Sequence, residues 1–245
     1  MKVESLILIY FMDMTTYIIH KNKNNKCANK SGKRLRMCKT TRAVMDEYEL
    51  AETIGYGSFS TVYKAKKRKE NGKFVAIKVA KIENENENDD FGDRILVYDL
   101  KRIEREIELW KPLDHDNLCR LLDIFIEEKE ERAYFFMEYA KDGDLLTILS
   151  EKGLESERIE DIFRQLCKAV EYLHDSGLVH GDIKLENILV SGEEIKLSDF
   201  GLARRAASKD LNFNCGTVEY AAPELLRSES IEDEFKTDIW SLGVA

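Results

Sequence analysis

The sequence of 245 residues contains no long apolar run and nothing typical of a secretory leader. Its longest uninterrupted apolar segment runs from about Leu6 to Met12, much shorter than the roughly 20 residues that span a bilayer. Glu4 interrupts the basic start that a signal peptide needs, and no small-residue cleavage site follows. We therefore expect no membrane-spanning segment and no membrane partner.

Cysteine is also scarce, because five residues, an odd number, are spread widely along the chain without a CxxC pair. This pattern predicts neither a disulfide framework nor a structural zinc site. Since free thiols are typical of a reducing compartment, we expect an intracellular protein, cytoplasmic or nuclear. Hydrophobic residues make up 43% of the chain, which is enough for a sizeable buried core.

Acidic residues are missing between Asp13 and Asp46, and residues 1–45 carry ten Lys or Arg against two acids. This segment is rich in Lys and Asn and has no apolar period, so we predict a basic disordered tail. The remaining 200 residues carry 28 basic and 45 acidic side chains, a net charge of −17. An acidic body disfavours nucleic acid as a partner, because neutralising phosphates needs clustered cations, and suits a basic polypeptide.

The first half of the folded region is predicted to form strands and one helix. Runs rich in β-formers predict strands at Glu49–Gly55, Ser60–Lys67, Lys73–Ala80, Cys119–Glu127 and Arg132–Tyr139. Asn71-Gly72 predicts a hairpin between the second and third of them. A helix is predicted over Asp93–Lys111, and Pro112 ends it. Its apolar face would comprise Ile95, Leu96, Leu100, Ile103, Ile107 and Trp110.

The second half is richer in helix. A long amphipathic helix is predicted over Ser156–Ser176, ended by Gly177. Its apolar face would comprise Ile159, Ile162, Phe163, Leu166, Val170 and Leu173. Two short strands are predicted on either side of Ser191-Gly192. A β-rich half with one helix followed by a helix-rich half predicts a two-lobed α+β fold.

Two features of the first half suit a nucleotide. Gly55 and Gly57 would let a turn between strands approach phosphates closely, although an ordinary hairpin turn has the same glycines. A turn that joins two strands argues against a Rossmann dinucleotide site. Lys78 in its strand could point inward and neutralise phosphate charge. A buried cation needs a partner, and Glu106 on the predicted helix offers one.

The segment from His180 to Asn187 is more specific, and it follows the long helix. It contains a carboxylate at Asp182, a lysine at Lys184 and the amide of Asn187. These groups would supply a proton acceptor, a phosphate-binding cation and a Mg²⁺ ligand. Further on, Asp199 ends a strand run and is a second carboxylate suited to Mg²⁺ held against phosphate oxygens.

Taken in order, these motifs resemble those of the eukaryotic protein kinase family, and the resemblance covers about Tyr48 to Ala245. They are joined by Cys215-Gly216-Thr217, Ala222-Pro223-Glu224 and Asp238–Gly243. The resemblance implies a kinase domain over residues 46–245, with an N-lobe at 46–139 and a C-lobe at 140–245. Lys184 and Thr217 imply a Ser/Thr kinase, which transfers the γ-phosphate of ATP to a protein hydroxyl.

The resemblance also implies a role for individual residues, with ATP and Mg²⁺ as cofactors. Asp182 would orient or deprotonate the acceptor hydroxyl, Lys184 would contact the γ-phosphate, and Asn187 and Asp199 would hold Mg²⁺. The nucleotide site would comprise Ile54, Gly55, Gly57, Val62, Ala76, Lys78, Glu106, Met137 as gatekeeper, Glu138, Ala140, Asp144 and Leu189. The supporting residues would be Asp238, bound to the catalytic-loop backbone, and a stack of Trp110, Leu121, His180 and Phe200.

The sequence departs from the family pattern at the glycine loop and before the catalytic Asp. Ser60 replaces the third loop glycine, with little expected effect. Gly181 replaces an arginine that in the family pairs with an activation-loop phosphate. Between residues 202 and 214 the only hydroxyl side chain is that of Ser208. We therefore expect activity that does not need phosphorylation of the activation loop.

The family's domain continues beyond Asp238–Gly243, so we expect a C-terminally truncated domain in which Glu224 lacks its arginine partner. This leaves a second function open, a pseudokinase or scaffold without turnover. A third is a small-molecule phosphotransferase, because His180-Gly181-Asp182 followed by Asn187 also resembles the aminoglycoside and choline phosphotransferases.

The substrate is expected to be a protein with a Ser or Thr acceptor. Asp144 and Glu186 stand where kinases that favour basic residues upstream of the acceptor have acids, although Asp144 would also serve the ribose. We therefore expect a preference for basic residues, in agreement with the acidic body. Asp90-Phe91-Gly92 repeats the metal motif, but it precedes Glu106 in an acidic run, so we interpret it as a linker.

Overall fold

The computed structural model describes residues 47–57, 60–69, 72–82, 100–127, 130–206, 216–227 and 233–245. Residue contacts divide the chain into two units, residues 1–49 and residues 50–245. Within the first unit the structure describes residues 47–49 alone, so the predicted basic tail at 1–45 lies outside the described residues. The side chains discussed below all lie in the second unit.

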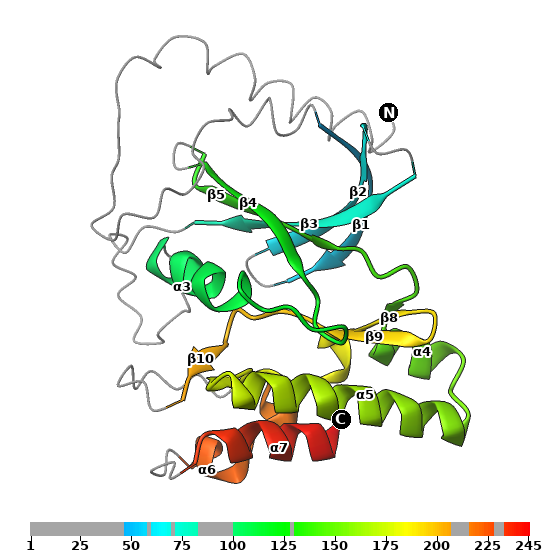
Figure 1. Ribbon diagram of the computed structural model, residues 1–245, viewed down its shortest axis with the longest axis vertical. Coiled ribbons are helices and arrows are strands. Elements are labelled where there is room, and N and C mark those ends of the chain that lie inside the picture. The colour runs from blue at the N-terminus through cyan, green and yellow to red at the C-terminus, as the bar shows by residue number, and fades with distance from the viewer. Residues whose placement is uncertain are drawn as a thin grey trace. The chain divides into compact units, whose positions relative to one another are not determined.

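A five-stranded sheet comes first in the chain, with strand order β1-β2-β3-β5-β4 (Figure 1). The strands are β1 (Tyr48–Tyr56), β2 (Ser60–Lys67), β3 (Phe74–Lys81), β4 (Leu121–Glu127) and β5 (Arg132–Glu138). The pairs β2–β3, β3–β5 and β4–β5 are antiparallel. All five predicted strands are confirmed, and their ends shift by two residues at most.

Strands β2 and β3 pair antiparallel, as the predicted hairpin requires. Gly72 has a φ of +85°, a left-handed conformation that glycine adopts without strain. The N–H of Lys67 donates to the carbonyl of Lys73 at 3.1 Å and closes the turn. Asn71, the other half of the predicted pair, lies outside the described residues.

The helix α3 (Leu100–Trp110) lies against this sheet (Figure 1). It confirms the C-terminal part of the predicted helix, whose residues 93–99 lie outside the described residues. Ile103, Ile107 and Trp110 are buried as predicted. Leu100 is 38% exposed, so its place on the buried face was wrong, because it is the first residue of the helix.

The remaining helices follow the sheet in the chain, and α7 lies alongside α5 (Figure 1). They are α4 (Leu145–Glu151), α5 (Ser156–Asp175), α6 (Pro223–Leu226) and α7 (Phe235–Val244), with the 3₁₀ turns η2 (Leu185–Asn187) and η3 (Val218–Tyr220). The short strands are β6 (Gly143–Asp144), β7 (Leu178–Val179), β8 (Ile188–Ser191), β9 (Glu194–Leu197) and β10 (Arg204–Arg205). Strands β8 and β9 confirm the pair predicted around Ser191-Gly192, and the sheets are β6-β8-β9 and β10-β7.

The helix α5 confirms the predicted amphipathic helix, and Gly177 follows it with a φ of +71°. Its buried residues are Ile162, Leu166, Ala169, Val170 and Leu173. Ile159 and Phe163 are each 48% exposed, contrary to the sequence prediction. The stripe that packs is therefore narrower than the apolar pattern, and it begins one turn later than predicted.

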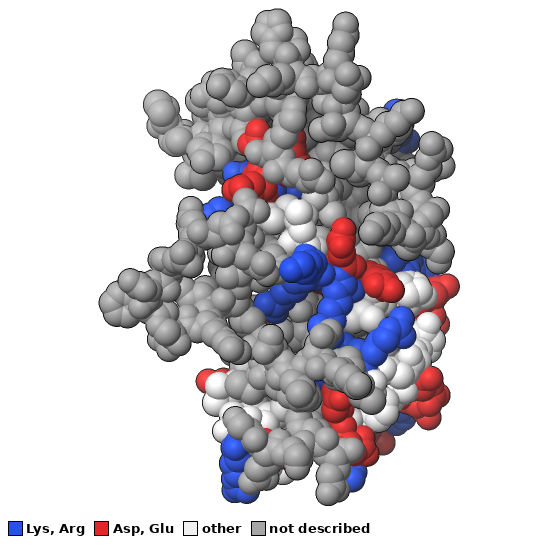
Figure 2. Space-filling model, turned by 90° about the vertical axis from the view of Figure 1, so that its left-hand side faces the viewer, with Lys and Arg blue, Asp and Glu red and all other residues white. Residues whose placement is uncertain are grey.

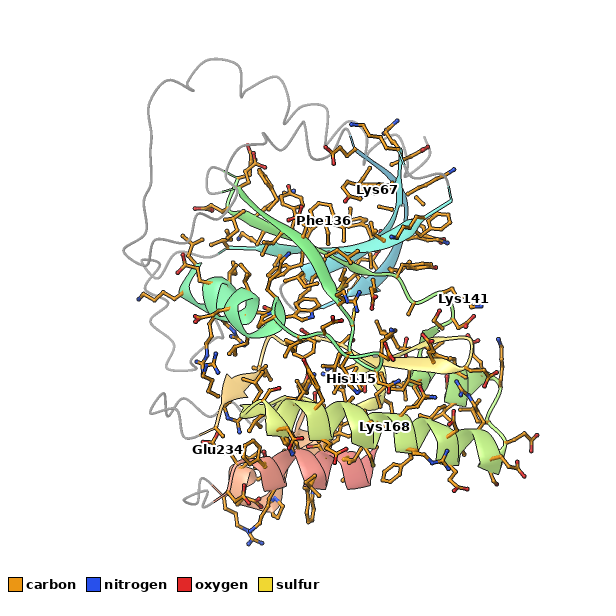
Figure 3. The ribbon with its side chains drawn as sticks, viewed as in Figure 1. Lys67, His115, Phe136, Lys141, Lys168 and Glu234 are labelled. Carbon is orange, nitrogen blue, oxygen red and sulfur yellow. The ribbon has the colours of Figure 1, made fainter. Side chains whose placement is uncertain are left out.

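The core is a continuous cluster that draws on β3, β5, α3, α5 and the β8–β9 hairpin. In the sheet, β5 is the most deeply buried strand, and Phe136 is 1% exposed (Figure 3). In the second half, His115 packs its ring against Tyr172 of α5, with ring centroids 5.1 Å apart. Among the described residues, no helix is both long and apolar enough to cross a membrane.

Basic side chains gather on one face of the molecule (Figure 2). Figure 2 shows Lys and Arg side chains gathered on the face where α3 and β10 lie. Lys101 and Arg205 are exposed there. Arg102 turns inward, and its guanidinium donates to the carbonyl of Gly201 at 3.4 Å. The segment that follows Asp199 therefore contacts the helix α3.

Candidate active site

Lys78 extends from β3 towards two carboxylates that come from separate elements. Its Nζ atom lies 2.8 Å from Oδ1 of Asp199 and 3.2 Å from Oε1 of Glu106. Asp199 follows β9, 121 residues further along the chain, and Glu106 lies on α3, 28 residues from Lys78. The structure thus brings together a lysine and two acids that occupy three separate motifs in the sequence.

Burial and mutual attraction set the charges of these three groups. Burial raises the pKa of Glu106, against the attraction of Lys78. The ammonium of Lys78 lowers the pKa of Asp199 to about 2. Burial alone would lower the pKa of Lys78, but the two carboxylates raise it. The site therefore holds a cation beside an ionised Asp199 at neutral pH, while burial opposes the ionisation of Glu106.

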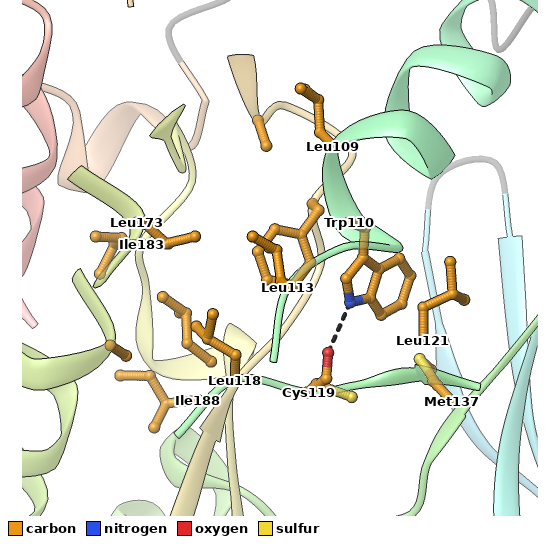
Figure 4. Close-up of a cluster of buried hydrophobic side chains, with 14 of the residues drawn as sticks. Leu109, Trp110, Leu113, Leu118, Cys119, Leu121, Met137, Leu173, Ile183 and Ile188 are labelled. Carbon is orange, nitrogen blue, oxygen red and sulfur yellow. Dashed lines mark hydrogen bonds between the residues drawn. The ribbon is translucent and has the colours of Figure 1, made fainter. Parts of the chain in front are cut away.

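The helix α3 is anchored beside the site by Trp110, which is 1% exposed. Its indole Nε1–H donates to the carbonyl of Cys119 at 2.6 Å (Figure 4). Its ring lies 5.2 Å from that of Phe200, and the ring of Phe200 lies 5.3 Å from that of His180. The predicted stack of Trp110, Phe200 and His180 is therefore present. Leu121, its fourth predicted member, is buried on β4 (Figure 4).

The carboxylate of Asp182 is held by donors on both sides. Its Oδ1 accepts from the N–H of Thr217 at 3.1 Å and from its hydroxyl at 2.9 Å. Its Oδ2 accepts from Nδ2 of Asn187 at 3.0 Å and lies 2.8 Å from Nζ of Lys184. Lys184 also donates to the hydroxyl of Thr217 at 2.7 Å. Thr217, Asn187 and Lys184 thus fix the orientation of the carboxylate before any substrate arrives.

Asp238 holds the backbone of the loop that carries Asp182. Its carboxylate accepts from the N–H of His180 at 2.8 Å and from the N–H of Gly181 at 2.9 Å. The imidazole of His174 on α5 lies 3.0 Å from the same carboxylate. Burial would raise the pKa of Asp238, but these hydrogen bonds lower it. The helix α7 therefore sets the position of the loop, as predicted for Asp238.

Asn187 and Asp199 are the two residues expected to hold Mg²⁺. The carbonyl of Asn187 accepts from the N–H of Ser198 at 2.8 Å and from its hydroxyl at 2.9 Å, so the backbone before Asp199 is tied to Asn187. Among the described residues, no group of three His, Cys, Asp or Glu could hold a metal alone. An amide oxygen, as on Asn187, and a carboxylate, as on Asp199, are the kinds of ligand that Mg²⁺ takes, with phosphate oxygens and water as its other ligands.

The predicted nucleotide-binding residues of the sheet lie on neighbouring strands. In the β2–β3 pair Val62 is opposite Lys78, and in the β3–β5 pair Ala76 is opposite Met137. Ala76 and Met137 are 4% and 7% exposed. Ile54 and Gly55 lie on β1, and a Cβ placed on Gly55 would meet Val62 at 3.7 Å. The structure therefore groups these side chains on the part of the sheet that holds Lys78.

The turn between β1 and β2 is closed by its own backbone. The N–H of Gly57 donates to the carbonyl of Ser60 at 2.7 Å. Ser60 thus takes part in the turn through its backbone, which any residue could supply. Ser58 and Phe59, between them, lie outside the described residues.

The remaining predicted residues lie where β5 leads into the second half. Glu138 ends β5, and its carboxylate accepts from the N–H of Arg120 at 3.2 Å. Ala140 follows it in the connecting segment, which leads to Asp144. The β6–β8 pair places Asp144 opposite Leu189. All four residues thus lie on the connection or beside it.

Asp144 also has a structural role that the sequence did not predict. Its Oδ1 accepts from the N–H of Thr147 at 2.8 Å and its Oδ2 accepts from the Thr147 hydroxyl at 2.9 Å. It is therefore the N-cap of α4, a helix absent from the sequence prediction. An aspartate directly before a short apolar run was the available signal.

A part-buried ion pair between Arg204 and Glu234 was also missed, since a single pair 30 residues apart leaves no periodic pattern in the sequence. Three predicted features lie outside the described residues: Ser208 in the activation loop, Cys215, and the repeated motif Asp90-Phe91-Gly92.

Comparison with known proteins agrees with this geometry. A sequence model of the protein kinase domain matches residues 48–245. Testis-specific serine/threonine-protein kinase 3 of Mus musculus is 36% identical over 204 residues, which cover 80% of this chain and 70% of that protein. The chain therefore belongs to the protein kinase family, and its fold is the α+β fold of that family, with a sheet-based N-lobe.

Other relatives are longer than this chain. A probable myosin light chain kinase of Dictyostelium discoideum is 35% identical over 208 residues, 82% of this chain and 49% of that protein. The probable serine/threonine-protein kinase KCC4 of Saccharomyces cerevisiae is 38% identical over 202 residues, 80% of this chain and 19% of that protein. The chain thus spans about half of the first relative and a smaller part of the second.

Proposed function

We propose that this chain is a Ser/Thr protein kinase that transfers the γ-phosphate of ATP to a Ser or Thr hydroxyl of a protein. The observation that carries the proposal is the position of Lys78, whose ammonium lies within 3.2 Å of both Glu106 and Asp199. A cation fixed between two acids from different motifs is the arrangement that neutralises phosphate charge beside a metal ligand. Two of the relatives have names that include serine/threonine-protein kinase, which supports the same acceptor class.

Each residue then has a task, either at the reacting end of ATP or in binding the rest of the nucleotide. Lys78 neutralises phosphate charge, and Glu106 keeps its ammonium in place. Asp199 and Asn187 would hold Mg²⁺, which when bound offsets the charge of the phosphate oxygens. Met137, Glu138 and Ala140 border the adenine. Ile54, Gly55, Gly57, Val62, Ala76 and Leu189 enclose the nucleotide, and Asp144 faces the ribose.

Asp182 is the group that receives the acceptor hydroxyl. Its carboxylate is already oriented by Thr217, Asn187 and Lys184, so little reorganisation is needed when the hydroxyl arrives. Lys184 lies next to that carboxylate and would contact the transferred phosphoryl group. The contact between Lys184 and Thr217 supports a Ser or Thr acceptor, which both residues indicate in the sequence.

The experiment is a transfer assay with the purified chain, ATP labelled on the γ-phosphate, Mg²⁺ and a panel of Ser- and Thr-containing peptides. We expect label on Ser or Thr of the peptides. Asp182→Asn should lower the rate by about 10²- to 10⁴-fold, because it removes the proton acceptor and keeps the shape. Asp175→Asn, which alters an exposed acid at the end of α5, is the matched control and should transfer at the normal rate.

The other outcomes separate the alternatives. ATP binding without any transfer would mean a pseudokinase. Label on aminoglycosides or choline instead of peptides would mean a small-molecule phosphotransferase. A chain that neither binds ATP nor transfers phosphate would contradict the whole proposal.

A further inference from the structure

A part-buried ion pair joins the segment after Asp199 to the start of α7. Arg204 lies on β10, five residues after Asp199, and its Nε–H donates to Oε2 of Glu234 at 2.8 Å. Both side chains are 11% exposed. Glu234 directly precedes α7 and lies close to β10 (Figure 3). A pair this shielded from water resists screening by salt and holds its two elements in one arrangement.

The guanidinium of Arg204 also fills the space beside Gly181. Gly181 has a φ of +79°, which strains any residue with a side chain. A Cβ at this position would lie 2.8 Å from Nη1 of Arg204 and 2.9 Å from the carbonyl oxygen of Leu202. Both distances are shorter than a Cβ tolerates, so a side chain at position 181 would displace the guanidinium and press against the Leu202 backbone.

The segment around Arg204 is also connected to the loop that carries Asp182, the residue proposed to receive the acceptor hydroxyl. Strand β10 pairs with β7, Arg204 opposite Val179, and the N–H of Ala206 donates to the carbonyl of Gly177 at 3.0 Å. β7 leads directly into Gly181 and Asp182. The helix that Glu234 precedes also carries Asp238, which accepts the N–H of Gly181. One end of the ion pair is thus fixed to the start of α7, and the other lies against the backbone before Asp182.

We infer that Arg204 and Glu234 are positioning residues that hold the loop of Asp182 and the segment after Asp199 in their working arrangement. The carboxylate of Glu234 supplies from within the chain the negative charge that the guanidinium needs. A phosphate added to the activation loop is then not required for that purpose. The inference rests on the proposed kinase function for its activity readout, and it names the residues that would make the site independent of loop phosphorylation.

The test uses the full chain, treated with a phosphatase, in steady-state transfer assays with ATP and a Ser-containing peptide. Glu234→Gln keeps the shape and removes the charge, and we expect kcat to fall about tenfold or more while KM for ATP stays unchanged. The exchanged pair, Arg204→Glu with Glu234→Arg, should recover part of the lost kcat. Arg205→Gln, on the exposed neighbour in β10, is the matched control and should have the normal kcat.

Hydrogen exchange provides a readout that does not depend on catalysis. Glu234→Gln should speed exchange of the Ala206 amide, which donates to Gly177, and leave the amides of α5 protected. If the chain transferred no phosphate but this change appeared, the proposed function would fail and the positioning role would stand. A normal kcat in Glu234→Gln, or normal protection of Ala206, would overturn the inference. So would a phosphatase-treated chain that is inert until its activation loop is phosphorylated.

Discussion

The Nζ atom of Lys78 lies 2.8 Å from Oδ1 of Asp199, a residue 121 positions further along the chain. Lys78 comes from the five-stranded sheet, and Asp199 follows the small hairpin β8–β9. The contact therefore joins the two halves of the fold at one pair of charges. Because the Lys78 ammonium also touches Glu106 of α3, three elements depend on a single cation.

This contact predicts a pH dependence of stability. The Asp199 pKa is lowered to about 2 by Lys78, below the ordinary value near 4, so its ionised form stabilises the fold. That contribution is complete above about pH 5 and is lost as the pH falls from about 4 towards 2. Urea unfolding gives the free energy of unfolding of the wild-type chain and of Asp199→Asn, and the difference between them should shrink as the pH falls over this range. Asp116→Asn, on an exposed acid, is the control, and a pH-independent difference would contradict the account.

Trp110 should be the aromatic residue on which α3 most depends. Trp110→Ala removes a buried ring and its hydrogen bond to Cys119, and we expect a loss of about 3–5 kcal/mol in the free energy of unfolding. Transfer should fall as well, since α3 carries Glu106. Trp240→Ala is the matched control, because Trp240 is 49% exposed, and its effect should stay within about 0.5 kcal/mol. Equal losses in urea unfolding would show that the stack does not anchor α3.

Asp144 caps the N-terminus of α4, and stability measurements can separate this role from its proposed contact with ribose. Asp144→Ala removes the cap of α4 and should cost about 1 kcal/mol in thermal unfolding. Asp144→Asn keeps a capping oxygen and should cost a few tenths of that. Both variants should raise KM for ATP if the carboxylate faces the ribose. Equal stability losses would rule out the cap, and an unchanged KM in both would rule out the ribose contact.

Glu186 tests the proposed preference for basic residues upstream of the acceptor. It is exposed on η2, four residues after Asp182. Glu186→Gln should lower kcat/KM for an Arg-containing peptide about two- to fivefold relative to a neutral one, as expected for an exposed ion pair. Glu151→Gln, an exposed acid on α4, is the control. Peptides that show no preference for Arg in the normal chain would remove the idea.

The sequence predicts the regular parts of this fold well. Five strands and the helix α5 have clear periods and clear ends, such as Gly72 and Gly177, whose positive φ angles suit glycine. The sequence predicts less well which apolar side chains are buried, because tertiary packing decides that. Phe163 fits the apolar pattern of α5 yet is 48% exposed, because a period shows which face is apolar without showing what covers it.

The sequence predicted those residues of the site that belong to recognisable motifs. Asp238 binds the loop backbone as expected, since the motif that contains it is specific. Strands β7 and β10 have two residues each, too few for any pattern. The pair of Arg204 and Glu234 likewise depends on the path of the chain between them, which no local signal reveals.

The central claim is that Lys78 and Asp199 act as one unit at the reacting end of ATP. A double-mutant cycle on kcat/KM, with Lys78→Met, Asp199→Asn and the double variant, tests it most directly. We expect each single change to cost about 100-fold or more, and the double variant to be about as slow as the slower single one. Losses that multiply in the double variant, or single variants with normal rates, would contradict the account.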